Sequence, residues 1–424
     1  MPRFRKLLKN RDFVLYSIGQ AFSQFGDRLV QIVLIGFIYK RWPGSTFQLA
    51  KLLFFTVIPS FLISPIAGVY VDRWNRKRIL VFSDLVRAAL IILIPIFFIN
   101  KESIIPIYLV VFLIFASACF FLPARLSVIP NLVSKEDLLL ANSASSITWV
   151  ISGIIGFSFG GLLAEWIGVQ NSLYINSLVY LLSAASFTVL IYSMQKRDAY
   201  AETERNSGSD SPKKTIARSF LNDLIKGIKT LFSDKKLKFV AYIFFILSAM
   251  TGAFYVVAVV FIQEILHSMT KSIGIFGMCL FVGIMLGSYV YGKTGHRYAR
   301  TKAIYLSLIM AGFFINAFTV VLQGTRSLWP GSFLVILLGL FIAPLYVSAN
   351  TIIYEFTESE LRGRIFSSIG VVMNLGFLIF MFISSMLAEN IDRFWILISC
   401  GSGFVLLGIL GMLTGFLKKT TFSS

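Results

Sequence analysis

Twelve apolar stretches, each long enough to cross a lipid bilayer as an α-helix, dominate this sequence of 424 residues. A helix needs about 20 mostly apolar residues to span the hydrocarbon layer, where its backbone groups must be satisfied within the helix itself. Only 14% of the residues are charged, too few for the surface of a soluble domain. The sequence therefore predicts an all-α integral membrane protein with twelve transmembrane helices. These are expected at residues 13–39, 47–71, 79–100, 104–126, 143–164, 171–193, 239–263, 272–291, 303–323, 330–353, 366–388 and 393–416.

The basic residues are distributed unevenly between the loops. If successive stretches alternate in direction, 30 of the 39 lysines and arginines fall on one side of the membrane and seven on the other. Cytoplasmic loops carry the excess of Lys and Arg, so both termini are predicted to be cytoplasmic. The formal net charge of +19 comes from short clusters between apolar stretches, which disfavours nucleic acid as a partner.

Two loops recur about half a chain later. Residues 68–83 align with residues 292–307, and residues 134–138 align with residues 357–361, at offsets of 224 and 223 residues. Two loops at nearly one offset indicate that a whole six-helix half was duplicated. Transporters built from such repeats hold their substrate near the midplane and open to each side in turn. We therefore predict two pseudo-symmetric six-helix bundles that enclose a site of this kind.

Residues 195–238 are predicted to form a cytoplasmic linker between a first bundle at 1–194 and a second at 239–424. The first part of the linker has too little apolar surface to fold alone. From Ile216 to Phe232, apolar residues recur on one helical face while basic residues lie off it. This pattern predicts an amphipathic helix that either rests on the lipid surface or packs on the bundle.

The first apolar stretch carries a polar stripe. Gln20, Gln24, Asp27 and Gln31 follow one another at spacings of four, three and four residues, so they share one face of a helix. A polar face is costly against lipid and is expected to line a watered cavity. Asp27 is the candidate for proton coupling, whereas a static ion pair with the neighbouring Arg28 is the alternative.

Other polar residues lie in later stretches. Asp84 and Arg87 are three residues apart and can pair on one helix face, either as a structural ion pair or as a gate. In the second bundle no acid or base falls at mid-span. The 42 Phe and 16 Tyr favour an aromatic cavity wall, which suits an amphiphilic or lipophilic organic substrate. Candidate cavity residues of the second bundle are Tyr255, Tyr346, Asn350 and Asn374.

The loop after the second stretch reads Gly68-Val-Tyr-Val-Asp72-Arg73-Trp-Asn-Arg76 and resembles the signature between helices two and three of the major facilitator superfamily. In that family the Gly allows close helix contact, and the Asp-Arg pair is thought to latch the cytoplasmic ends of the two halves. The resemblance implies that Gly68, Asp72, Arg73 and Arg76 form a cytoplasmic gate. An ordinary positive-inside anchor is the alternative for the basic cluster.

The whole chain is similar to the branch of that superfamily that holds macrolide exporters, siderophore exporters and lysophospholipid flippases. Gly156, Gly160 and Gly161 resemble the Gly-Pro-x-x-Gly-Gly antiporter motif of drug exporters, with Phe157 in place of its Pro. Close helix packing would also account for these glycines. The residues that carry the wider similarity are Phe25 to Leu29, Ile129 to Val133, Ala141-Asn142 and Gly363-Arg364.

Several classes of site are disfavoured. Residues 287–294 match the phosphate-loop pattern G-x-x-x-x-G-K-T, but that loop needs a strand before it and an α/β domain around it. Here it falls in an apolar helical stretch, so no nucleotide site is predicted. The two histidines lie on opposite sides of the membrane, and no nucleophile and base fall together. We therefore expect no metal, no cofactor and no enzymatic activity.

These features predict a secondary active transporter that exports amphiphilic or lipophilic organic compounds of the drug, macrolide or siderophore type. Protons are the favoured coupling ion, in an antiporter of the cytoplasmic (inner) membrane of a bacterial-type cell. A lysophospholipid flippase of the same fold is one alternative. A membrane channel or a sensor without active transport is the alternative of another class, although one polar stripe does not make a continuous pore. The expected partners are the small amphiphilic substrate, protons and membrane lipids, and we expect a monomer.

Overall fold

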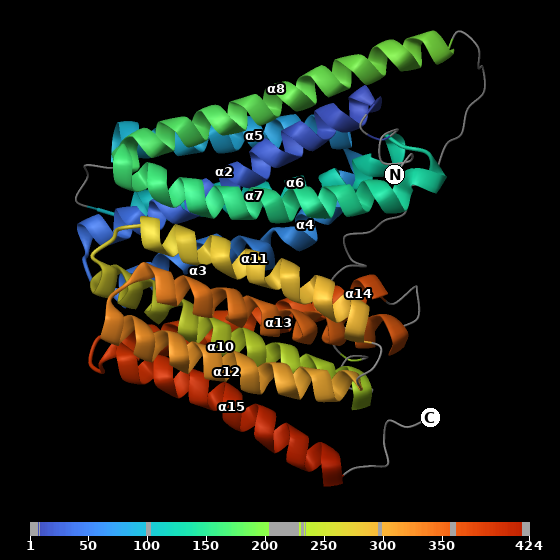
Figure 1. Cartoon of the computed structure of the whole chain (residues 1–424). Helices are drawn as coiled ribbons and strands as arrows, with labels where there is room; N and C mark the ends of the chain where they lie inside the picture. Colours follow the sequence, from blue (N-terminus) through green and yellow to red (C-terminus); the bar gives the residue numbers. More distant parts are fainter. Residues whose placement is uncertain are drawn as a thin grey trace. The chain divides into compact units, whose positions relative to one another are not determined.

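The predicted set of membrane helices is confirmed by the computed structural model, which describes residues 7, 9–98, 103–202, 229, 233, 235–295, 299–356 and 362–417. Among these residues, eleven helices are long and apolar enough to cross a membrane. The twelfth crossing is made by the shorter apolar helix α3 together with α4 (Figure 1). The helices are α2 (Arg11–Arg41), α3 (Thr46–Leu62), α4 (Ser64–Arg73), α5 (Arg76–Leu93), α6 (Ile105–Val128), α7 (Leu138–Trp166), α8 (Gly168–Glu202), α10 (Lys235–Leu266), α11 (Lys271–Thr294), α12 (Arg300–Thr325), α13 (Leu328–Phe356), α14 (Arg362–Leu387) and α15 (Arg393–Leu417).

Proline explains where the second and third crossings depart from a regular helix. Pro59 lies inside α3, and Pro65 lies in the first turn of α4, where its missing N–H has no intrahelical partner to lose. The backbone is carried across the break because Ile63 N–H donates to the Pro59 carbonyl at 2.8 Å. After Leu93, α5 continues as a π-helix over Ile94–Phe98, a stretch that contains Pro95.

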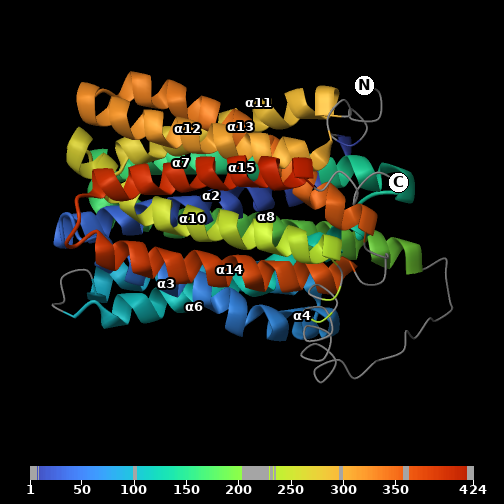
Figure 2. The same cartoon turned by 90° about the horizontal axis from the view of Figure 1, so that it is seen from below.

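The helices group into two compact units, each described here by itself. The first unit holds Met1–Ile35 and Leu52–Leu221, and the second holds Gly36–Lys51 and Asn222–Ser424. In the first unit, α5 packs against α6 and α8, α6 packs against α4, and α7 packs against α8. In the second, α11 packs against α13, α10 against α14, and α12 against both α13 and α15 (Figure 2).

The boundaries of these units differ from the predicted bundles at two places. Helix α8 runs to Glu202, so the chain remains helical past the predicted boundary at residue 194. Residues 36–51, at the end of α2 and the start of α3, group with the second unit although they belong to the first predicted bundle. The predicted amphipathic helix at 216–232 lies outside the described residues, apart from residue 229.

Small residues let helices approach closely in both units. A Cβ built on Gly156 of α7 would lie 2.6 Å from Arg28 Cβ of α2, and one on Gly160 would lie 2.7 Å from Ile32 Cγ2. In the second unit, a Cβ on Gly283 of α11 or Gly339 of α13 would collide with the backbone of the facing helix. Lipid does not drive helices together, so such close van der Waals contact is what holds them.

The turn between α2 and α3 is anchored by polar contacts within the second unit. Gly44 has a left-handed φ of +79°, and its carbonyl accepts from Arg393 Nη2 at 2.5 Å. Arg393 Nη1 also pairs with Glu264 at 2.9 Å. Glu389 accepts from the Phe47 amide at 3.3 Å at the start of α3, and the buried Thr46 donates to the Ser385 carbonyl at 3.0 Å. The turn and the start of α3 are thereby tied to α14 and α15, and Arg393 in turn pairs with α10.

Candidate functional site

Three charged side chains, which we call the ion cluster (Asp27, Asp84 and Arg87), meet inside the first unit. Arg87 of α5 donates from Nη1 to Asp27 Oδ1 of α2 at 2.7 Å and from Nη2 to Asp84 Oδ1 one turn earlier on its own helix. Arg87 and Asp84 are completely buried, whereas the Asp27 side chain remains 31% exposed. Asp27 is therefore the one member of the cluster that is not completely buried.

Hydroxyl groups from α2 and α8 complete the cluster. Ser183 donates to Asp84 Oδ2 at 2.5 Å, and Ser23 donates to Asp84 Oδ1 at 3.1 Å. Tyr180 donates to Asp27 Oδ1 at 2.6 Å, the same oxygen that accepts from the guanidinium. Both oxygens of Asp84 are thus engaged, while among the described residues no donor reaches Asp27 Oδ2.

Two aromatic rings hold the guanidinium in place. The Arg87 Cζ atom lies 4.7 Å from the ring centroids of both Phe121 of α6 and Tyr180 of α8. A cation over an aromatic face is attracted by the ring quadrupole, more strongly when it is desolvated. Gly26 of α2 makes room for this arrangement, since a Cβ there would lie 3.0 Å from the Tyr180 ring. Four helices therefore fix one buried cation.

The ion cluster has one more carboxylate than it has cations. With every member ionised its charge is −1, and an uncompensated charge is expensive away from water. Another cation, Arg125 of α6, is buried, and Asp27 acts on it electrostatically; its Nε atom has no partner among the described residues. Uptake of one proton at Asp27 Oδ2 would make the cluster neutral.

Arg28 is not the partner of Asp27, so the alternative of an Asp27–Arg28 ion pair is wrong. The Arg28 guanidinium lies 5.7 Å from the Trp149 ring centroid and 5.6 Å from that of Phe157, both on α7. Neighbouring residues on a helix do not face each other, so Asp27 and Arg28 point to different helices.

The polar stripe of α2 is more buried than expected. Gln20 is completely buried and exchanges two 2.8 Å hydrogen bonds with Ser145 of α7. Gln24 is 7% exposed, and its Oε1 atom has no partner among the described residues. Gln31 is partly exposed and accepts from Arg28 at 3.5 Å. Only the Asp27 and Gln31 end of the stripe is partly exposed, because Gln20 and Gln24 are buried between helices.

The remaining predicted residues have mixed outcomes. The predicted pairing of Asp84 with Arg87 is confirmed, although as part of a larger cluster. Gly68, Asp72 and Arg73 lie in α4, but their side chains fall outside the described part of the structure. Arg76 begins α5 and donates to the Ser127 carbonyl of α6 at 3.4 Å. The cytoplasmic gate therefore stays a prediction.

The glycines of the antiporter-like motif take part in helix packing. Gly156, Gly160 and Gly161 are all buried in α7, and the first two lie directly against α2. This contact supports the packing alternative.

The second-unit candidates are spread over three helices. Tyr255 of α10 lies with its ring centroid 6.5 Å from that of Phe377. Asn350 and Tyr346 share α13, where Asn350 donates to the Tyr346 carbonyl at 2.9 Å, and Asn374 lies on α14. Their role in a substrate cavity also remains a prediction.

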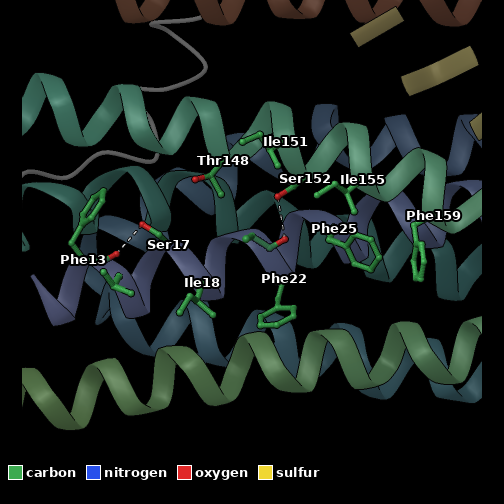
Figure 3. Close-up of a pocket in the computed structure, with 12 residues that line it drawn as sticks. Phe13, Ser17, Ile18, Phe22, Phe25, Thr148, Ile151, Ser152, Ile155 and Phe159 are labelled. Atoms are coloured by element: carbon green, nitrogen blue, oxygen red, sulfur yellow. Dashed lines mark hydrogen bonds between the residues drawn. The ribbon is translucent and has the colours of Figure 1, made fainter. Parts of the chain in front are cut away.

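An apolar groove runs between α2 and α7 and encloses about 760 Å³ (Figure 3). The rings of Phe13 and Phe159 stand near opposite ends of it, with Phe22 and Phe25 between them. Its polar lining consists of three hydroxyls whose hydrogens are donated to backbone carbonyls of α2 and α7. These hydroxyls belong to Ser17, Thr148 and Ser152. The groove thus offers an apolar wall and no free donor.

Tyr180, Ser183, Ser23 and Phe121 were not among the predicted site residues. The three-residue spacing of Tyr180 and Ser183, and the four-residue spacing of Ser23 and Asp27, each mark one polar helix face that could have drawn attention. The contact of these faces with α5 depends on how the helices are rotated, which helical periodicity does not fix.

A set of membrane-crossing helices with a buried ion cluster and an adjoining apolar groove defines a polytopic membrane transporter. The profile of the Major Facilitator Superfamily matches residues 16–334 and 241–421, and the chain belongs to this family.

The similar proteins of known sequence include exporters. The chain is 26% identical to the putative bacilysin exporter BacE of Bacillus subtilis over 416 residues, covering 94% of this chain and 93% of that protein. It is 24% identical to macrolide efflux protein A of Streptococcus pyogenes, covering 90% of each chain. It is also 24% identical to the uncharacterized MFS-type transporter YkuC of Bacillus subtilis, covering 85% of this chain and 81% of that one.

Solved structures share the fold at much lower identity. An auto-inhibited POT family peptide transporter matches with a TM-score of 0.72 and 10% identity over 98% of each chain. The nucleoside transporter NupG matches with a TM-score of 0.69 and 12% identity, covering 95% of this chain and 99% of that one. The predicted major facilitator fold of twelve helices is thereby confirmed.

Proposed function

We propose that this transporter exports amphiphilic or lipophilic organic compounds in exchange for protons, with Asp27 as the proton-binding group. The observation that carries the proposal is the partly exposed Asp27, one of whose oxygens is unengaged while the other holds Arg87 and Tyr180. Two relatives, the putative bacilysin exporter and macrolide efflux protein A, are named for export, which supports the direction of transport. The proposed setting is a bacterial cytoplasmic membrane with both termini inside the cell.

Protonation would change how α2 is held. Ionised Asp27 binds the guanidinium of Arg87, whereas neutral Asp27 loses the charge that makes this bond strong. A proton can shift the equilibrium between the inward-open and outward-open states only if it binds one of them more tightly than the other. Release of α2 from α5 on protonation would give the two states different proton affinities.

The substrate would bind in the groove between α2 and α7. Its volume of about 760 Å³ lies within the roughly 300–1,000 Å³ usual for small-molecule sites. Phe25 lines the groove and is two residues from Asp27 on the same helix. Substrate and proton would therefore act on one segment of α2, which is the coupling that exchange requires.

A transport assay with Asp27→Asn tests the proposal. Asparagine keeps the shape and can still accept from Tyr180, but it cannot exchange a proton. In proteoliposomes with an imposed pH gradient, we expect Asp27→Asn to lose uphill accumulation of a lipophilic drug while drug exchange at equal pH continues. Glu136→Gln, which neutralises an exposed carboxylate between α6 and α7, is the matched control. If Asp27→Asn still accumulates the drug against the gradient as well as the unsubstituted protein does, Asp27 is not the proton-coupling group.

A lysophospholipid flippase is the second candidate, favoured by the apolar wall of the same groove. An acyl chain needs no hydrogen-bond donor, and the groove offers none that is free. The proteoliposomes separate the two candidates when they are loaded in turn with a macrolide and with labelled lysolipid. Movement of the lysolipid alone would replace the drug-export proposal.

A further inference from the structure

A second groove in the first unit lies between α4, α5 and α6 and has no part in the proposed transport cycle. It encloses about 1010 Å³. Its walls are mostly large apolar side chains, several of which are strongly exposed, with Phe82 at 67% and Ile66 at 49%. In a chain that crosses a membrane, exposed apolar side chains of this kind contact lipid tails.

The interior of this groove suits a hydrocarbon chain better than a polar solute. Val86, Leu90 and Leu113 continue the apolar wall. Ser117 donates its hydroxyl hydrogen to the Ser83 carbonyl at 3.2 Å, so it offers no free donor. A polar solute entering here would lose its bonds to water without replacing them.

One end of the groove is basic and lies at the start of α5. Asn75 caps the helix by accepting from the backbone amides of Lys77 and Arg78 at 3.1 and 3.4 Å. Arg78 is exposed and lines the groove, and no described acidic side chain pairs with it. Arg76 and Lys77 precede Arg78 in the sequence, so the start of α5 carries three basic residues, of which Arg78 lines the groove. Such a cluster next to an apolar surface is complementary to anionic lipid headgroups.

Trp74 lies at this mouth, where its side chain suits a membrane interface. Its indole is 55% exposed, lines the groove, and stacks on the Phe120 ring at a centroid distance of 6.5 Å. Tryptophan is enriched where headgroups meet hydrocarbon. From Asn75 to Leu90 the groove follows α5 for about 22 Å. This exceeds the roughly 15 Å depth of one leaflet, so an acyl chain can be accommodated along its length.

We propose that this groove binds one acyl chain of an anionic phospholipid whose phosphate is held by Arg78. The charge at the mouth selects the headgroup, and the apolar wall takes the chain. The same helix α5 carries Asp84 and Arg87, so the bound lipid lies against the helix that supports the ion cluster. The proposal does not depend on which substrate is transported or on proton coupling.

Photo-crosslinking of the full-length protein in nanodiscs tests this site. The probe is a phosphatidylglycerol with a diazirine near the end of one acyl chain, and adducts are mapped by mass spectrometry. We expect adducts on the α5 and α6 segments that line the groove. Arg78→Gln should reduce them about fivefold, the effect of removing one basic residue from an anionic headgroup. Ala116→Trp should reduce them as well, because the indole fills the groove.

Two controls make the result decisive. Lys302→Gln removes an exposed cation of α12 at the position that aligns with Arg78 in the sequence repeat, and it should leave the adducts unchanged. A phosphatidylcholine probe with the same chains should label the groove at least about fivefold less. Equal labelling by both probes, or undiminished labelling of Arg78→Gln, would overturn the proposal. If Ala116→Trp fails to fold, the exposed Arg78→Gln variant decides the matter alone.

Discussion

The fully buried Arg87 should be the most sensitive single position of the first unit. Arg87→Gln removes the cation between Asp27 and Asp84 while keeping a side chain that can still donate hydrogen bonds. Removing one partner of a buried ion pair costs about 3–5 kcal/mol, because the remaining charge is left uncompensated. Loss of the cation from between the rings of Phe121 and Tyr180 adds about 1–2 kcal/mol. We therefore expect destabilisation of about 4–7 kcal/mol.

The measurement is the unfolding free energy in mixed micelles, followed by helical circular dichroism as a denaturing detergent is titrated in. A rescue variant separates the charge effect from a loss of packing. In Arg87→Gln with Asp84→Asn, the buried carboxylate that the first change leaves unpaired is neutralised as well. We expect this double variant to recover at least half of the lost stability.

The exposed Arg326, at the end of α12, provides the control, and Arg326→Gln should change stability by less than about 0.5 kcal/mol. A loss below about 1 kcal/mol for Arg87→Gln would refute the reasoning, since that is the range of an exposed pair. Failure of the double variant to recover any stability would show that packing of the guanidinium dominates over its charge.

Three further outcomes follow from the contacts. Tyr180→Phe keeps the ring beside the guanidinium but removes a hydrogen bond to Asp27, so it should lower stability by about 1.5 kcal/mol in thermal melts, and an unchanged melting temperature would contradict this. Gly156→Val should lower stability by about 1–3 kcal/mol, because α2 must move away from the added side chain. Gly370→Ala adds a Cβ that meets nothing within 4 Å, so it should leave stability unchanged. Equal losses of stability in thermal melts would reject the packing argument. Arg393→Gln should free the turn between α2 and α3. In a background without native cysteines, a cysteine that replaces the buried Thr46 should then react at least about tenfold faster with a thiol reagent. An unchanged rate would show that other contacts hold the turn.

The sequence was sufficient to predict the membrane helices, and it drew attention to Asp27, which lies in the ion cluster while its role stays a prediction. Hydrocarbon leaves a crossing segment little choice but a helix, so length and apolar content decide the fold class. A carboxylate in such a segment is costly enough to mark a site by itself. Both inferences concern one segment at a time, which is why they need no knowledge of packing.

The partners of Asp27 could not be predicted in the same way. Arg28 is adjacent in sequence, but successive residues on a helix point about 100° apart. The actual partner, Arg87, is on α5, and the contact depends on how α2, α5 and α8 are rotated against each other. Gln20 shows the same difficulty, because its burial depends on Ser145 of another helix. Likewise, nothing local indicates that residues 36–51 group with the second unit.

Helix α2 starts in one unit and finishes in the other, so one continuous helix belongs to both. Its residues up to Ile35 belong with the ion cluster, while those from Gly36 onward belong with the anchored turn. About 21 Å of helix separates Asp27 from Arg41, the last residue of α2. Beyond that end, Arg393 donates to the Gly44 carbonyl and Glu389 accepts from the Phe47 amide, which holds the turn between α2 and α3. A shift of α2 along its axis would therefore have to move Arg393 and Glu389 with it or break their hydrogen bonds to this turn.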